Sequence, residues 1–134
     1  MYCVVPLAGP DFYHESYGIK PFLEYKGKAL IESILSARSW YPQIETFIFA
    51  LQDDERSRSC AEVLQRTFPS SRFVFISNFT RGALLSSLSA VSLIDDFTKP
   101  LVVDLVDIDY DSSDFRPLSI FSDGDVKGIV PYFI

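Results

Sequence analysis

Short apolar runs alternate with amphipathic stretches along this chain. Runs rich in β-branched and aromatic residues predict strands over residues 2–8, 44–51, 72–79, 101–111 and 126–134. Apolar residues at helical spacing predict helices between them. Strands that alternate with helices predict an α/β fold, here a three-layer α/β/α sandwich with a mostly parallel sheet.

Three helices follow from this spacing, and each is expected to bury one face. Over residues 28–40 the apolar positions should pack on the sheet, while Arg38 should face water. A second helix should start near residues 52–55 and carry its apolar stripe as far as Phe68. Over residues 84–94 the expected buried side consists of Leu84, Leu85, Leu88, Val91 and Ile94, with serines around it.

Composition describes one folded domain of 134 residues, of which 48% are hydrophobic. Net charge is −6 and the 12 Lys and Arg residues are scattered, which argues against nucleic acid as a partner. There is no apolar run of membrane-spanning length and no signal-peptide pattern at the start, so no membrane partner and a cytoplasmic location are expected. Cys3 and Cys60 are expected to be two buried thiols, and His14 is expected to be solvated in a polar loop.

The first 35 residues carry a candidate phosphate site. A buried strand runs into a loop that contains Gly9, and Lys20 lies ahead of the following helix. Backbone N–H groups and an ammonium can meet at the carboxyl end of such a strand and bind phosphate there. This arrangement points to a nucleotide as the ligand.

Carboxylates form the second candidate group. On an extended backbone, Asp107, Asp109 and Asp111 would share one side, because side-chain direction repeats every two residues. Hard oxygen ligands of this kind suit Mg²⁺ that arrives with substrate phosphates. A solvated strand end, with some of the carboxylates acting as caps or turn formers, is the alternative. For Asp53 and Asp54 a helix cap is favoured over a metal site.

Several segments together resemble the sugar-phosphate nucleotidylyltransferases. Their opening pattern is Leu-Ala-Gly-Gly-x-Gly-Thr-Arg, then Pro-Lys-Pro-Leu and Gly-Lys-Pro-Leu-Ile; here the matching residues are 7–9, 18–24 and 27–31. Two departures stand out. Residues 10–15 replace two glycines and an Arg of the family, and Val106 stands where the family has a Gly before its metal-binding Asp.

This resemblance implies a truncated nucleotide-diphospho-sugar transferase-like fold over residues 1–134, corresponding to the nucleotide-binding half of a longer enzyme. It implies Mg²⁺-dependent transfer of a nucleotidyl group from a nucleoside triphosphate to a sugar or polyol phosphate. Lys20 would neutralise phosphate charge and Asp107, with Asp109 beside it, would hold the metal. The implied nucleotide-binding residues are Leu7, Ala8, Gly9, Gly82 and Ala83.

Two other functions fit the same residues. The chain could be a non-catalytic module that binds a nucleotide or a sugar nucleotide, since the glycines and the Arg of the family loop are missing. It could also be a glycosyltransferase, because Asp107-Ile108-Asp109 fits the Asp-x-Asp motif with which those enzymes hold a metal. Base, sugar and oligomeric state stay open.

Overall fold

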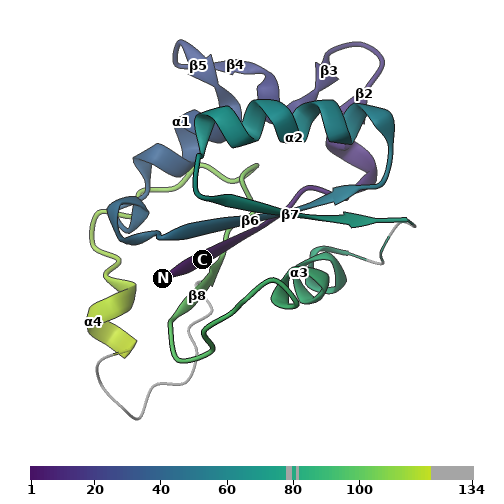
Figure 1. Cartoon of the computed structure of the whole chain (residues 1–134). Helices are drawn as coiled ribbons and strands as arrows, with labels where there is room; N and C mark the ends of the chain where they lie inside the picture. Colours follow the sequence, from purple (N-terminus) through teal and green to yellow (C-terminus); the bar gives the residue numbers. More distant parts are fainter. Residues whose placement is uncertain (78–79, 81, 122–134) are drawn as a thin grey trace.

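A four-stranded parallel sheet forms the centre of the molecule, with strand order β7-β6-β1-β8. The structure is a computed structural model that describes residues 1–77, 80 and 82–121. Helices α1 and α2 cover one face of the sheet and α3 covers the other (Figure 1). The α/β fold is therefore confirmed, and the arrangement is compatible with the predicted three-layer sandwich. The strand predicted over residues 126–134 lies outside the described residues.

The bounds of most of the main elements follow the predicted pattern with small shifts, but β8 is much shorter than predicted. The sheet strands are β1 (Tyr2–Pro6), β6 (Thr46–Gln52), β7 (Ser71–Ile76) and β8 (Leu101–Val103). The helices are α1 (Leu30–Ala37), α2 (Glu55–Thr67), α3 (Ala83–Val91) and α4 (Pro117–Phe121). Short hairpins pair β2 (Tyr13–His14) with β3 (Gly18–Ile19) and β4 (Glu24–Tyr25) with β5 (Lys28–Ala29). Single 3-10 turns are η1 (Pro10–Phe12), η2 (Lys20–Phe22) and η3 (Tyr41–Gln43).

Two cores lie on opposite faces of the sheet. Alternate residues of β1 divide between them, because side chains of a strand point to opposite faces in turn. Cys3 and Val5 belong to the larger core, which includes Phe49 and the buried residues of α1 and α2. Val4 belongs to the smaller core on the α3 side. Both thiols are buried and free, as predicted.

Helix α2 begins where the acidic residues predict. The side chain of Asp54 accepts a hydrogen bond from the backbone N–H of Ser57 at 2.7 Å, which is an N-cap contact. Asp53 pairs with Arg58 on the surface. The cap interpretation is confirmed for Asp54, whereas Asp53 forms a surface ion pair. None of the helices in the described part of the chain is both long and apolar enough to cross a lipid bilayer.

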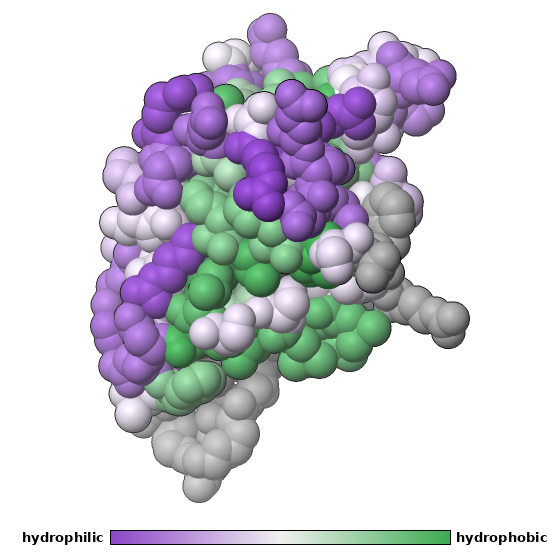
Figure 2. All heavy atoms as spheres, turned by 45° about the vertical axis from the view of Figure 1, so that its right-hand side comes forward, coloured by the Kyte–Doolittle hydropathy of each residue, from purple (hydrophilic) through white to green (hydrophobic). Residues whose placement is uncertain are grey.

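Helix α3 turns the opposite face to the sheet from the one predicted. Its buried residues are Ser86, Ser87 and Ala90, whereas Leu84 and Leu88 are 72% and 57% exposed. In Figure 2 an apolar surface is visible in the lower part of the view, where α3 lies. Small side chains let the helix lie close to the sheet. The sequence of α3 contains no charged residue that would indicate which face is exposed to solvent. The predicted burial of the leucines was wrong, whereas Ile94 is buried and Val91 packs against the smaller core, as predicted.

Two further predictions were wrong at the ends of elements. Arg38 is 2% exposed and not turned to water, because α1 ends at Ala37 and the arginine lies in the turn that follows. The strand predicted over residues 101–111 ends at Val103, and the chain continues as turns and loops. Asp111 accepts a hydrogen bond from the N–H of Ser113 at 2.9 Å, as a turn-forming residue does.

The strand order contains a reversal at β1. From β1 the chain builds outward through β6 to β7, then returns to place β8 on the other side of β1. In open α/β sheets, ligands bind beyond the carboxyl ends of the strands at the point where the order reverses. The topology therefore directs attention to the segments that follow β1 and β8, and the segment that leads from β7 into α3 contributes residues at the same place.

Candidate functional site

A pocket of about 250 Å³ lies at these three strand ends. We call it the Lys20 pocket. Its volume is near the lower limit for small-molecule sites, roughly 300 to 1,000 Å³. Six of the predicted site residues line it, which are Leu7, Gly9, Lys20, Gly82, Ala83 and Asp107.

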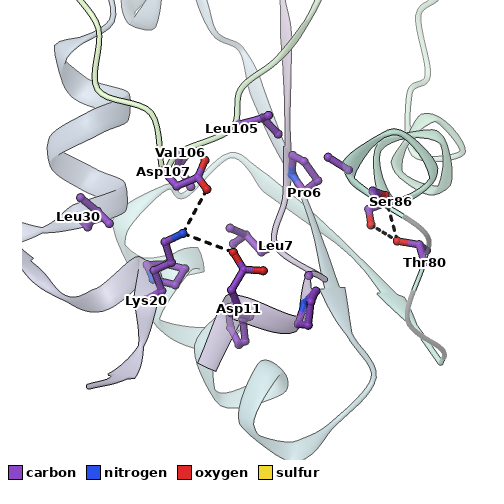
Figure 3. A pocket seen from close by; sticks show the side chains of 16 residues that line it. Pro6, Leu7, Asp11, Lys20, Leu30, Thr80, Ser86, Leu105, Val106 and Asp107 are labelled. Atoms are coloured by element: carbon purple, nitrogen blue, oxygen red, sulfur yellow. Dashed lines mark hydrogen bonds and ion pairs between the residues drawn. The ribbon is translucent and has the colours of Figure 1, made fainter. Parts of the chain in front are cut away.

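Lys20 is the cationic group of this pocket. It begins the 3-10 turn η2, and its Nζ lies 3.2 Å from Asp107 Oδ2 and 3.6 Å from Asp11 Oδ2 (Figure 3). Partial burial disfavours the charged ammonium, but the hydrogen bonds and charges of Asp107 and Asp11 outweigh this and raise the pKa of Lys20. The side chain is 29% exposed, so a ligand can reach it. Lys20 therefore offers a permanent positive charge at the pocket wall.

The two predicted metal ligands have different partners. Asp107 faces Lys20, whereas Asp109 Oδ2 accepts hydrogen bonds from Tyr25 Oη at 2.7 Å and from Lys26 Nζ at 3.2 Å. These two contacts lower the pKa of Asp109. Asp109 does not line the Lys20 pocket. The structure therefore brings Asp107 and Lys20 together but does not bring Asp109 into the same place.

The loop after β1 places two of its three predicted residues at the pocket. Leu7 extends the sheet by donating its N–H to the carbonyl of Ala50 at 2.8 Å. Ala8 is buried, and its carbonyl accepts a hydrogen bond from Gln52 Nε2 at 2.9 Å, so it supports the loop without lining the pocket. Gly9 lines the pocket and precedes η1.

The opposite wall comes from the start of α3. Gly82 has φ of 101°, a backbone conformation that glycine adopts readily and other residues rarely do. An added Cβ at Gly82 would meet no heavy atom within 4 Å, so the glycine is required by its backbone angle rather than by crowding. Ala83 begins the helix beside it. Thr80 Oγ1 and Ser86 Oγ lie 2.5 Å apart on this wall, across the pocket from Lys20 (Figure 3).

Sequence reasoning missed three polar residues of this pocket. Asp11 is one, although it lies in the loop that departs from the family pattern and a carboxylate there was a visible signal. Thr80 and Ser86 are the others; they looked like ordinary polar residues at the start of a helix. Only the tertiary fold shows that their hydroxyls face the same space as Lys20.

The net charge of the Lys20 pocket determines whether an anion can bind there without a cation. One ammonium stands between two carboxylates, Asp11 and Asp107, so the group as a whole carries one negative charge. A polyphosphate would be repelled unless it brought a cation. Among the described residues, no group of three or more side chains could hold a metal by itself. Asp107 alone therefore fits Mg²⁺ only as an ion that is held mainly by substrate phosphates and water.

The chain matches no protein-family model and no curated protein sequence at a significant level.

Proposed function

We propose that the chain is a nucleotidyltransferase-like domain that binds a nucleoside triphosphate with Mg²⁺ in the Lys20 pocket. The observation that carries this proposal is the 3.2 Å contact between Lys20 and Asp107, which are 87 positions apart in sequence. The contact lies beyond the carboxyl ends of β1 and β8, where the strand order reverses. At such a site the carboxylate can bind Mg²⁺, and the ammonium can bind the phosphate oxygens that come with it.

Different residues of the pocket would contact the triphosphate and the base of the ligand. The triphosphate would lie between Lys20 and Asp107, while the base would lie against Gly82, Ala83 and the apolar wall near Leu7. Mg²⁺ would join Asp107 to the phosphates and reverse the negative balance of the site. The domain fold we propose is the one the sequence resembles, that of the nucleotide-diphospho-sugar transferases.

The parent reaction would be transfer of the nucleotidyl group to a sugar or polyol phosphate. A phosphate oxygen of that acceptor attacks the α-phosphorus while the bond to the leaving pyrophosphate breaks. The chain supplies positioning and charge for this step rather than covalent chemistry. Lys20 would stabilise the negative charge that develops on the phosphate oxygens.

Calorimetry with each of the common nucleoside triphosphates, with and without Mg²⁺, tests the binding step. We expect heat of binding for at least one of them with Mg²⁺ and loss of that heat in Lys20→Ala. Lys26→Ala is the matched control, because Lys26 makes a 3.2 Å ion pair with Asp109 outside the pocket. Its binding should equal that of the wild type. If none of the triphosphates binds, the proposed function is wrong.

Release of pyrophosphate in the presence of a panel of sugar phosphates separates an enzyme from a binding module. Release that requires the acceptor and disappears in Lys20→Ala would support nucleotidyl transfer. Tight binding without release would favour the non-catalytic alternative. Preference for a sugar nucleotide over every triphosphate would favour the glycosyltransferase, although Asp109 is paired with Tyr25 and Lys26 rather than directed into the pocket.

A further inference from the structure

The segment that carries Asp107 has no regular secondary structure of its own. Residues 104–116 connect β8 to α4 through turns and loops, and Asp107 lies in this segment. Backbone hydrogen bonds attach its beginning to the sheet, as when the N–H of Asp104 donates to the carbonyl of Val4 at 3.0 Å. Other contacts have to fix the path of the chain on both sides of Asp107.

Arg38 supplies most of those contacts. Its guanidinium donates from Nε to Asp104 Oδ2 at 2.9 Å and from Nη2 to Asp104 Oδ1 at 3.3 Å, a two-pronged ion pair that is almost fully buried. It also donates from Nη2 to the carbonyl of Ile108 at 2.6 Å and from Nη1 to the carbonyl of Tyr110 at 3.3 Å. One planar group therefore binds the segment before Asp107 and after it.

Two neighbouring contacts extend this hold. The guanidinium carbon lies 3.7 Å from the centre of the Tyr110 ring, in cation–π geometry. The next residue, Ser39, donates its backbone N–H to Ser112 Oγ at 2.9 Å and donates from Oγ to the carbonyl of Phe115 at 2.7 Å. The turn at residues 38–39 thus contacts the 104–115 stretch at several points on both sides of Asp107.

We propose that Arg38 is a positioning residue of the candidate site, which sets the path of residues 104–110 so that Asp107 faces Lys20. The functional importance of this positioning rests on the proposed function, but the placement of Asp107 can be measured without any nucleotide. Arg38 does not line the pocket. It acts through the backbone carbonyls that flank Asp107.

An ordinary structural ion pair is the competing explanation for Arg38. Buried ion pairs add little net stability compared with well-packed apolar residues of similar volume, because both charges lose their hydration. The two carbonyl contacts are the feature that such a replacement would remove. Lysine could keep the charge opposite Asp104 but would lack the planar fork that reaches Ile108 and Tyr110 at the same time.

Zero-length cross-linking with a water-soluble carbodiimide measures the placement directly. The reagent joins a lysine to a carboxylate that is already in contact with it, and peptide mass spectrometry quantifies each product. In the wild type, Lys20 should join both Asp107 and Asp11, which lie at 3.2 and 3.6 Å. The Lys20–Asp11 product does not involve the 104–110 segment and serves as the internal reference.

The informative variant is Arg38→Met combined with Asp104→Leu, since it removes both buried charges together. We expect it to stay folded by circular dichroism, while the ratio of the Asp107 product to the Asp11 product falls about tenfold, because lost hydrogen bonds to a charged donor shift a local equilibrium by roughly this factor. Arg38→Lys should lower the ratio in the same direction, and it decides the question by itself if the double variant does not fold.

Arg72→Met is the matched control. Arg72 also binds a carboxylate, Asp95, and a backbone carbonyl, that of Leu93, but on the far strand β7. Its cross-link ratio should equal that of the wild type. An unchanged ratio in a folded Arg38 variant would overturn the positioning role. Absence of nucleotide binding in the wild type would instead remove the proposed function and leave the cross-link result standing.

Discussion

The orientation of α3 can be tested by single substitutions on its two faces. Leu84 is 72% exposed, so only about a quarter of the side chain is removed from water. Full burial of a leucine is worth roughly 2 kcal/mol, so Leu84→Ala should reduce the free energy of unfolding by about 0.5 kcal/mol. Leu35 of α1 is fully buried, and Leu35→Ala should cost about 2 to 5 kcal/mol because it leaves a cavity.

The face of α3 that lies on the sheet should tolerate added volume poorly. Ala90 is fully buried in the smaller core, so Ala90→Leu should cost about 1 to 3 kcal/mol through overpacking. Urea denaturation followed by circular dichroism gives all three values, provided that the slope of the unfolding free energy against urea stays constant. A loss of about 2 kcal/mol or more in Leu84→Ala, with little effect of Ala90→Leu, would show that the leucines form the buried face after all.

Two further predictions concern charged groups. Lys99 lowers the pKa of Glu45 to about 2, and Arg72 lowers the pKa of Asp95 to about 2. Folded-state pKa values below the ordinary ones mean that these pairs stabilise the protein above about pH 4.5 and lose that contribution as the pH falls toward 2, so the melting temperature should fall over this range and less so in Glu45→Gln. Removing the negative charge of the pocket with Asp11→Asn should strengthen binding of a Mg²⁺-triphosphate by roughly fivefold in calorimetry, because one like charge near a polyphosphate is worth about 1 kcal/mol. Weaker binding in that variant would contradict the charge balance argued for the site.

The strands of the sheet could be predicted from the sequence because they are almost wholly apolar. Central parallel strands are covered on both faces, so β6 and β1 appear as continuous runs of β-branched and aromatic residues. The start of α2 was readable for a different reason, since Asp54 caps the helix through a contact only three residues away. Local signals of this kind need no knowledge of the rest of the fold.

The contact between Lys20 and Asp107 was only partly predictable. Each residue was expected at the carboxyl end of a parallel strand, and the resemblance to the nucleotidylyltransferases suggested a shared site. That β8 lies directly beside β1 depends on strand order, which hydrophobic pattern does not encode. Asp109 shows the limit of the pattern, because the strand ends at Val103 and the alternation of side chains that was expected to align it with Asp107 does not hold there.

Three of the failed predictions concern residues that line the Lys20 pocket or hold a segment that lines it. Arg38 breaks the expected amphipathic pattern and holds the segment that carries Asp107. Ser86 takes a buried position that the leucines were expected to fill, and it lines the Lys20 pocket. Residues 105–107 leave the predicted strand and form another wall of the same pocket. Departures from local rules are expected at functional or strained sites, so these three support the proposal that the Lys20 pocket binds a ligand.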